Sequence, residues 1–408
     1  MRKVIAALAL ATWVASAAFA GQTFYAATNG DDGAPGSQEK PWKTLSAAAE
    51  TLKAGDTLVV APGTYGPATL TRGGSAGAPV TIRAAEKLKA IVDGKGGTAK
   101  VETGTAGFAF KGPECRHVVL EGFEIVRSSW GVLVDGGASF IEVTDCDIHG
   151  CRMGVKVAAG TDCVFRRLKL HDNKYGMHLG DKDKNRPHRM LVEDCEARNN
   201  HNKTQSAGDP ISKDNCDGFC VECGDAQNIV FRRCFASGST DAAYDLKPDD
   251  VVLENCIAGG DCAEGFKLWR GARLANCLSY GNSRWAVQTS GGSNKPVEMI
   301  NCTLVVGKRS AVEVRGQVRM VNCIVVGAVQ GAVEEDYSLL SEGAESARKG
   351  QHSLTGDPKF KDPAKGDFHL HDGSPAVDSG TSAGAPQTDL DGSPRPKGKG
   401  PDMGAYER

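Results

Sequence analysis

The sequence predicts an all-β protein, a single-stranded right-handed parallel β-helix with a short N-terminal capping helix and an irregular C-terminal tail. A short strand signal, in which a small residue precedes an apolar, a variable and an apolar residue, recurs every 21 to 25 residues through most of the chain. Such period-two alternation marks a strand with one buried face. A unit this short cannot bury its own apolar face, so successive units must stack around one long core.

Other repeat architectures fit this spacing less well. A propeller blade needs about 40 residues, and a leucine-rich repeat has a Leu-rich consensus that this chain does not show. The 51 glycines suit a fold with several tight corners in each coil. The net charge of −2, with no basic block, argues against a nucleic-acid partner.

The chain opens with a predicted secretory signal over residues 1–20. A basic start precedes an apolar run that closes on Ala-Phe-Ala, the pattern of a signal peptide with a small-x-small cleavage site. We expect cleavage after Ala20 and a secreted or periplasmic protein. Because no other apolar stretch is long enough to span a bilayer, we expect no membrane span in the mature chain.

Residues 21–78 are predicted to form the N-terminal cap and the first strands. Leu45 to Leu52 has the pattern of a short amphipathic helix with Thr44 as its N-cap, and a first strand follows at Leu58 to Ala61. Bare edge strands invite aggregation, so we expect the helix to cover the open end of the solenoid. This segment resembles the entry module of many exported β-helix polysaccharide lyases.

Residues 79–326 are predicted to form the coils, with a second apolar column that ends in cysteine. The cysteines of this column are Cys195, Cys234, Cys256, Cys277, Cys302 and Cys323. Their equivalent repeat positions predict an inward stack of small buried thiols. Cys216, Cys220 and Cys223 have the spacing of a radical iron–sulfur motif, but within an exported repeat strand we favour a local disulfide.

Polar segments interrupt the repeat just before the candidate site. Gly180 to Arg189 is a charged loop, and Asn199 to Asn215 is an insertion that lengthens one repeat. Loops on a rigid scaffold commonly build binding sites, although both segments also suit solvated loops. After Val326 the repeat fades, and residues 327–408 are predicted to be a tail that packs back on the last coils.

The candidate site lies within residues 214–270, where three copies of the strand signal differ in charge. The outward position of the aligned strands gives one column: Leu133, Lys156, His178, Cys220, Asp245, Lys267, Gln288 and Glu313. Successive coils lie about 4.8 Å apart, so we expect Asp245 and Lys267 to be neighbours on the outer surface. Asp217 and Asp241 lie in the turns before this strand on adjacent coils, and Asp214 is close by.

These clustered carboxylates predict a Ca²⁺ site beside a lysine. Carboxylates repel one another, so without a cation some of them must protonate. Ca²⁺ takes about six to eight oxygen ligands, and carboxylates from turns suit it. A bound Ca²⁺ would also disfavour the protonated form of Lys267, which moves the amine toward the neutral form that a general base needs. An ordinary Asp–Lys ladder between coils is the alternative.

The motifs N-C-D-G-F, S-T-D-A-A-Y-D-L and E-G-F-K-L resemble those of polysaccharide lyase family 9, the pectate-lyase-like β-helix enzymes. The resemblance implies that Asp217, Asp241 and Asp245 are Ca²⁺ ligands and that Lys267 is the catalytic base. One family aspartate, next to the position of Asp241, is Ala242 here. Glu264 or Asp214 would then have to compensate for it.

The resemblance further implies β-elimination on a pectate-like uronic-acid polymer. The base takes the C5 proton, Ca²⁺ neutralises the adjacent carboxylate as a Lewis acid, and the C4 oxygen leaves to give an unsaturated sugar. Arg270, His178 and Lys156 are candidate contacts to neighbouring uronates, or else solvated outer residues. We expect a monomer that acts on an acidic polysaccharide.

The residues leave two other functions open. The chain could be a non-catalytic carbohydrate-binding or surface β-helix protein with a degenerate calcium site, an interpretation that Ala242 favours and Lys267 opposes. It could instead be a glycoside hydrolase with Asp241 and Asp245 as its paired acids, but Lys267 would then have no clear role.

Overall fold

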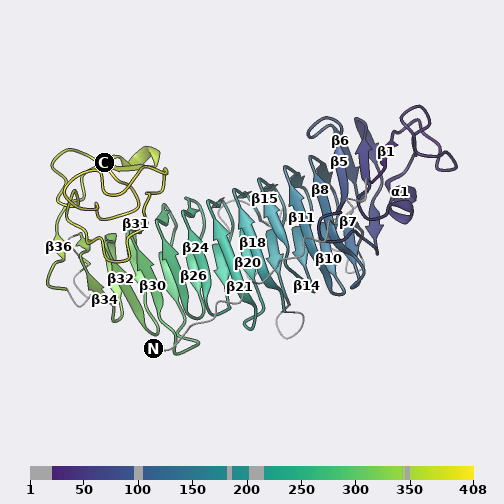
Figure 1. Cartoon of the computed structure of the whole chain (residues 1–408). Helices are drawn as coiled ribbons and strands as arrows, with labels where there is room; N and C mark the ends of the chain where they lie inside the picture. The colour runs from purple at the N-terminus through teal and green to yellow at the C-terminus, as the bar shows by residue number, and fades with distance from the viewer. Residues whose placement is uncertain (1–20, 96–103, 182–185, 202–215, 342, 345–349) are drawn as a thin grey trace, which may run out of the picture.

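The computed structural model describes residues 21–95, 104–181, 186–201, 216–341, 343–344 and 350–408. The chain winds into a long solenoid whose strands pair in parallel from coil to coil, with the only antiparallel strand pair of the described residues in the C-terminal tail (Figure 1). The predicted parallel β-helix is confirmed. In these ranges no helix is long and apolar enough to cross a membrane. The predicted signal at residues 1–20 lies outside them.

Each coil contributes strands to three columns, called first, second and third in the order in which the chain passes through them. The first column holds β1 (Thr23–Ala26), β2 (Thr57–Val60), β5 (Val80–Ala84), β8 (Arg116–Glu121), β11 (Ala138–Thr144), β14 (Gly160–Thr161), β15 (Val164–Arg166), β18 (His188–Glu193), β21 (Gln227–Arg232), β24 (Val251–Glu254), β27 (Ala272–Ala275), β30 (Val297–Ile300), β32 (Val318–Val321) and β34 (Glu334–Asp336).

The second and third columns together form the other large sheet. The second column holds β3 (Gly63–Tyr65), β6 (Ala90–Asp93), β9 (Glu124–Val126), β12 (Asp147–His149), β16 (Lys169–His171), β19 (Glu196–Arg198), β22 (Phe235–Ser237), β25 (Ile257–Ala258) and β28 (Leu278–Tyr280). The third column holds β4 (Ala68–Leu70), β7 (Ala106–Lys111), β10 (Trp130–Asp135), β13 (Met153–Val157), β17 (Tyr175–Leu179), β20 (Phe219–Val221), β23 (Ala242–Leu246), β26 (Glu264–Leu268) and β29 (Trp285–Thr289).

The two columns merge near the C-terminal end of the solenoid. The long strand β31 (Thr303–Glu313) pairs with both β28 and β29, and β33 (Ile324–Gln330) pairs with β31. Two short strands, β35 (Leu339–Leu340) and β36 (Leu354–Thr355), extend the same ladder.

The predicted helix is confirmed as α1 (Leu45–Thr51). The Thr44 hydroxyl accepts a hydrogen bond from the Ala47 N–H at 3.2 Å, which satisfies one of the backbone donors that the first turn leaves free. Leu45 and Ala48 are buried and belong to the core at the N-terminal end, beside β1 (Figure 1).

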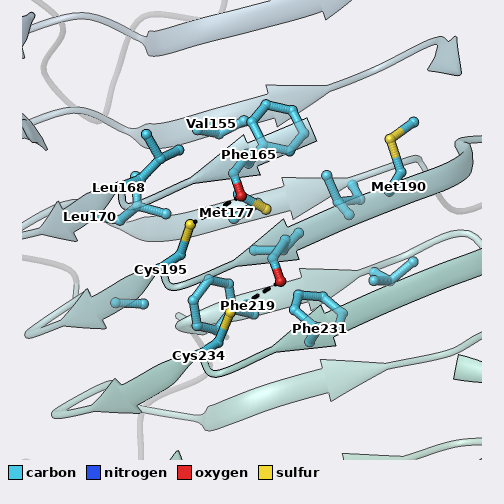
Figure 2. Close-up of a cluster of buried hydrophobic side chains, with 14 of the residues drawn as sticks. Val155, Phe165, Leu168, Leu170, Met177, Met190, Cys195, Phe219, Phe231 and Cys234 are labelled. Carbon is cyan, nitrogen blue, oxygen red and sulfur yellow. Dashed lines mark hydrogen bonds between the residues drawn. The ribbon is translucent and has the colours of Figure 1, made fainter. Parts of the chain in front are cut away.

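One cluster of buried apolar side chains runs along the solenoid. Figure 2 shows part of it, where Cys195 and Cys234 lie among Phe219, Phe231 and other apolar side chains. The Cys195 thiol donates a hydrogen bond to the Phe165 carbonyl at 3.4 Å, so the thiol is both buried and partnered. The predicted inward column of small thiols is confirmed.

The cysteines around β20 do not form the local disulfide that the sequence favoured. Cys220 and Cys223 are free thiols. Cys223 lies in the core cluster, whereas Cys220 lies in the outward ladder in register with Asp245. Since both thiols are free and belong to opposite faces, no disulfide joins the three cysteines of this group, and that prediction was wrong.

An asparagine row marks the corner between the first and second columns in the last coils. These residues have φ between 50° and 55°, a left-handed conformation that Asn tolerates better than most residues. The row consists of Asn255, Asn276, Asn301 and Asn322.

The asparagine row holds the C-terminal tail through side-chain donors. Asn301 Nδ2 donates to the Asp402 carbonyl at 3.0 Å, and Asn322 Nδ2 donates to the Thr381 carbonyl at 2.8 Å. The tail includes the antiparallel pair β37 (Phe360–Asp362) and β38 (Asp367–Leu370), joined by the 3₁₀ turn η1 (Pro363–Lys365). It covers one side of the C-terminal coils (yellow in Figure 1).

Candidate active site

The candidate site lies on the third column, where β20, β23 and β26 follow one another. Asp217 and Asp241 end the turns before β20 and β23, while Asp245 lies on β23 and Lys267 on β26. One oxygen from each of the three aspartates lies within 4.8 Å of the other two. The structure thus brings these four predicted residues together. Asp214 lies outside the described residues.

The register of the third column places the charged residues on neighbouring coils. Asp245 is in register with Lys267, and Cys220 is in register with Asp245 on the other side. Behind them, the inward residues Phe219, Tyr244 and Phe266 stack with ring centroids 5.2 and 5.0 Å apart. The site therefore stands on a well-packed part of the core.

The site is more buried than an outward position predicts. Asp217 and Asp245 are each 1% exposed, and Asp241 is 8% exposed. Trp269, itself 38% exposed, donates its indole N–H to Asp245 Oδ1 at 2.6 Å and shields that carboxylate. Asp245 and Lys267 are neighbours as expected, but the prediction that Asp245 lies on the outer surface was wrong.

Lys267 is held between two of the aspartates. Its Nζ lies 2.9 Å from Asp241 Oδ2 and 3.7 Å from Asp245 Oδ2. Burial alone would lower the pKa of Lys267, but the negative charges of Asp245 and Asp241 outweigh it and hold the pKa above its ordinary value. With both aspartates ionised and no further cation present, the amine is therefore protonated.

In the two most buried aspartates, Asp217 and Asp245, the effect of burial on the pKa is larger than that of the neighbouring cation. Burial, followed by the charges of Asp245 and Asp241, raises the pKa of Asp217 well above its ordinary value. Burial also raises the pKa of Asp245, although the charge of Lys267 opposes the shift. Each of these two carboxylates has one oxygen engaged, Asp217 Oδ1 by the Ala242 N–H at 3.0 Å and Asp245 Oδ1 by Trp269.

Glu264 adds a fourth carboxylate next to this group. It lies in register with Ala242, and its Oε1 accepts a hydrogen bond from Arg284 Nη1 at 2.9 Å. Its Oε2 is buried and receives no hydrogen bond from a donor of the described residues. Burial and the neighbouring carboxylate of Asp241 raise the pKa of Glu264 to about 7.

The carboxylate oxygens of this cluster fit a divalent cation. The described residues give the cluster four carboxylates but only two cationic side chains in direct contact, Lys267 and Arg284. Uncompensated buried charge is costly, and the facing Glu264 and Asp241 carboxylates cannot both stay ionised without either a shared proton or a cation. A hard cation with oxygen ligands, such as Ca²⁺, matches both the charge and the donor type.

A row of side chains beside the site was missed in the sequence, although the alternation that predicted the strands marks it. Each member lies two residues after an outward residue of the third column and so shares its face. The pairs are Cys220 with Glu222, Asp245 with Lys247, and Lys267 with Trp269. Lys247 Nζ lies 2.5 Å from Glu222 Oε1 and 5.3 Å from the centroid of the Trp269 ring.

Lys156 and His178 continue the outward column on the preceding coils, where they are in register with each other. Lys156 is only 6% exposed, so the solvated alternative was wrong for this residue. Its Nζ lies 2.5 Å from Asp181 Oδ1 and 3.0 Å from His178 Nδ1. Burial and the charge of Lys156 lower the pKa of His178 to about 4, so this imidazole is neutral at neutral pH.

Arg270 lies just after β26, at the rim of the site. Its Nη1 donates to the Gly224 carbonyl at 3.0 Å and lies 3.8 Å from Asp225 and 4.0 Å from Asp249. The side chain is 36% exposed, so the guanidinium is positioned and still accessible.

Comparisons with known proteins place this geometry in context. A family model described as "Pel9A-like, right handed beta helix region" matches residues 24–303. The structure of the pectate lyase Pel9A superposes with a TM-score of 0.62 at 19% identity, over 95% of this chain and 96% of that one. An alginate lyase from Paenibacillus sp. str. FPU-7 gives a TM-score of 0.55 at 15% identity, over 77% of this chain and 99% of that one. At these identities, the two likenesses show a shared fold.

A curated relative matches a shorter segment. The uncharacterized protein YwoF of Bacillus subtilis (strain 168) is 29% identical over 140 residues. These residues make up 32% of this chain and 30% of YwoF, so the chain spans less than a third of that relative.

Proposed function

The chain belongs to the Pel9A-like right-handed β-helix family, and from this premise we propose that it is a polysaccharide lyase that cleaves a pectate-like uronic-acid polymer by β-elimination. One observation carries the proposal: Lys267 lies against two buried carboxylates of the preceding coil, 2.9 Å from Asp241 and 3.7 Å from Asp245. A base beside a cation-binding group of oxygens suits the removal of a proton next to a sugar carboxylate.

Lys267 is the base in this proposal. Its Nζ takes the C5 proton, and the electron pair left on C5 forms the C4–C5 double bond. The C4–O glycosidic bond then breaks, and the departing oxygen takes up a proton from solvent. The amine must be neutral at the start, so the negative charge that Asp241 and Asp245 direct at it has to be offset.

Asp217, Asp241 and Asp245 are the proposed Ca²⁺ ligands. When bound, Ca²⁺ neutralises the substrate carboxylate and stabilises the charge that develops on it as a Lewis acid. Asp217 and Asp245 are each held at Oδ1, by the Ala242 N–H and by the Trp269 indole N–H, and we assign their Oδ2 atoms to the cation.

The side chains along the third column suit an acidic polymer. Arg270 and Lys247 carry positive charge beside the cluster, and the Trp269 ring offers a flat apolar surface whose centroid lies 5.3 Å from Lys247 Nζ and 5.9 Å from Lys267 Nζ. Lys156 and His178 extend the same column over the preceding coils. We assign the cationic Arg270, Lys247 and Lys156 and the neutral His178 to contacts with neighbouring uronates of the bound chain.

The proposal includes export. The predicted signal at residues 1–20 would be cleaved after Ala20, and the mature protein would act as a monomer on a polysaccharide outside the cytoplasm. N-terminal sequencing of the protein recovered from the periplasm or the medium tests the cleavage, and light scattering tests the monomer. A mature chain that still begins at Met1 would contradict the export.

The decisive experiment follows ultraviolet absorbance of the unsaturated product during incubation of the mature protein with polygalacturonate, with and without Ca²⁺. Alginate is assayed alongside. A Lys267→Met variant removes the amine and keeps most of the aliphatic stem, while Lys361→Met, at an exposed position in the tail, is the matched control. Circular dichroism shows whether each variant is folded.

We expect a Ca²⁺-dependent rise that Lys267→Met abolishes and Lys361→Met preserves. New reducing ends without the absorbance would support the glycoside hydrolase alternative. Binding of a uronan by the folded protein without any product would support the non-catalytic carbohydrate-binding alternative. Either of these two results overturns the lyase proposal.

A further inference from the structure

We propose that Glu264 supplies a fourth carboxylate oxygen to the cation site, reaching it from the coil that follows Asp241 and Asp245. The inference rests on the proposed function, because it concerns the same Ca²⁺ site. Three geometric observations carry it: the register of Glu264, its burial, and the state of its two oxygens.

The register places Glu264 directly across from a gap in the ligand set. Ala242 opens β23 immediately after Asp241, and its side chain ends at Cβ, so it offers no ligand. Glu264 opens β26 and is the register partner of Ala242. The Glu264 N–H donates to the Asp241 carbonyl at 3.2 Å, which fixes the two backbones side by side.

The length of the side chain suits this position. Adjacent strands of a parallel sheet lie about 4.8 Å apart, and the extra methylene of Glu relative to Asp extends its reach across such a gap. A carboxylate on β26 can therefore substitute in space for one at position 242. Asp241 directly precedes Ala242 in the chain, and its carbonyl accepts hydrogen bonds from the N–H groups of Ala263 and Glu264 on the next coil.

The two oxygens of Glu264 are in different states. Oε1 is neutralised by Arg284 Nη1 at 2.9 Å. Oε2 is buried without a hydrogen-bond donor among the described residues, in a residue that is only 1% exposed. Buried polar atoms are nearly always partnered, and the Glu264 carboxyl lies within hydrogen-bond range of the Asp241 carboxylate, so this pair needs either a shared proton or a bound cation. Arg284 holds the carboxylate by one oxygen and leaves the other for the cation.

The test measures Ca²⁺ affinity of the mature protein by calorimetry, with Tb³⁺ luminescence as a second readout, so that catalysis is not needed. Glu264→Gln keeps the shape and removes the charge. Glu264→Asp keeps the charge and shortens the reach. Glu313→Gln, on the same column beyond the site, is the matched control because Glu313 is paired with Gln288 and Arg315.

We expect Glu264→Gln and Glu264→Asp each to weaken Ca²⁺ binding about 10- to 100-fold, the range seen when a metal site loses a supporting group. Glu313→Gln should bind like the wild type. The double variant Ala242→Asp/Glu264→Gln moves the carboxylate back to β23 and should recover most of the affinity.

The outcomes separate this inference from the proposed function. Unchanged affinity in both folded Glu264 variants overturns the inference and leaves the Ca²⁺ site intact. A wild-type protein that does not bind Ca²⁺ overturns the Ca²⁺-assisted function and this inference together. If Glu264→Gln fails to fold, Glu264→Asp still decides the question.

Discussion

At Lys267, burial and neighbouring charge act on the amine in opposite directions, and the neighbouring charge is the larger effect. Asp245 and Asp241 hold the pKa above its ordinary value. The ion pair that positions the lysine therefore also keeps it protonated until another cation shares the carboxylates. The residue can be a positioned cation in one state and a base in the other.

A Lys267→Arg variant separates these two roles. Arginine keeps the positive charge beside Asp241 but stays protonated in proteins, so it cannot take a proton. We expect at least about a 100-fold loss of turnover, the lower end of what a general base contributes. Thermal unfolding should place its stability within about 1 kcal/mol of the wild type. An arginine variant that retained lyase activity would exclude Lys267 as the base.

Asp217 should make the cation-free protein less stable at neutral pH. Its folded-state pKa is raised above the ordinary 3.8, so the native state binds the proton more tightly than the unfolded state. Stability is then lost as the pH rises from about the ordinary value through the raised one. In EDTA at neutral pH, Asp217→Asn should be more stable than the wild type by roughly 0.5–2 kcal/mol in free energy of unfolding. It should therefore unfold at a higher temperature.

The pH dependence of stability distinguishes the ionisation of Asp217 from any stabilising effect of the substitution that does not involve its charge. The gain from Asp217→Asn should shrink as the pH falls toward 3.8, where the native aspartate is also neutral. Added Ca²⁺ should reverse the order of the two proteins, because only the wild type binds it fully. Asp261→Asn, at an exposed left-handed position, should show neither effect. Equal melting temperatures for Asp217→Asn and the wild type in EDTA would contradict the prediction.

Among the elements, the strands of the third column were predictable because one rule fixed their alignment. Period-two alternation identified the inward and outward residues, and equal repeat positions stack in a parallel solenoid. The pairing of His178 with Cys220, across the insertion, and of Asp245 with Lys267 therefore follows from aligning the strand signals. The same rule extended by two residues would have identified Lys247 and Trp269.

Other features depend on contacts that spacing does not encode. The burial of Asp245 comes from Trp269, a side chain of the next coil, and no local pattern announces that cover. The unpartnered oxygen of Glu264 becomes visible only when every neighbouring donor is placed. The expected disulfide failed because the alternation that puts Cys220 outward puts Cys223 in the core.

The sequence marks the asparagine row by the residue that precedes each column cysteine. Asn precedes cysteine at four successive corners, whereas Asp145, Asp194 and Arg233 precede it on earlier coils. Those earlier residues take part in ion pairs: Asp145 with Arg167 and Asp194 with Arg233. The change from charged residues to Asn marks where the tail covers the solenoid.

An Asn322→Asp variant tests this role of the row. Asn322 donates to the Thr381 carbonyl at 2.8 Å and accepts from the Thr381 N–H at 2.8 Å. Aspartate keeps the left-handed backbone and the acceptor but loses the buried donor, which should cost roughly 1–3 kcal/mol. Hydrogen exchange and limited proteolysis should show a looser tail. Asn228→Asp, at an exposed position with φ of 55°, is the control and should leave the tail protected.

For the whole molecule, the reactivity of the buried cysteines measures whether the coils of the solenoid are stacked. All 14 are buried, and most belong to the core that runs along the axis. Burial raises the pKa of thiols such as Cys146 and Cys163 to about 12, which suppresses the reactive thiolate.

We therefore expect the native protein to react very slowly with a thiol reagent at neutral pH. Labelling should rise sharply over the same denaturant range in which the β-sheet signal is lost, because exposure requires the coils to separate. Mass spectrometry of partly labelled protein shows which cysteines react first. Rapid labelling of the column cysteines in the native state would contradict the core described for this fold.

The asparagine row also changes how the end of the stack can come apart. In a bare solenoid each coil contacts only its neighbours, so the last coil can fray without disturbing the others. Here Asn255 and Asn276 donate hydrogen bonds to the tail carbonyls of Asp389 and Thr388. These two asparagines lie at least two coils before the C-terminal end of the solenoid. Peeling off the final coil must also release the tail from those inner coils, so the four corners that carry the asparagine row open as one cooperative unit.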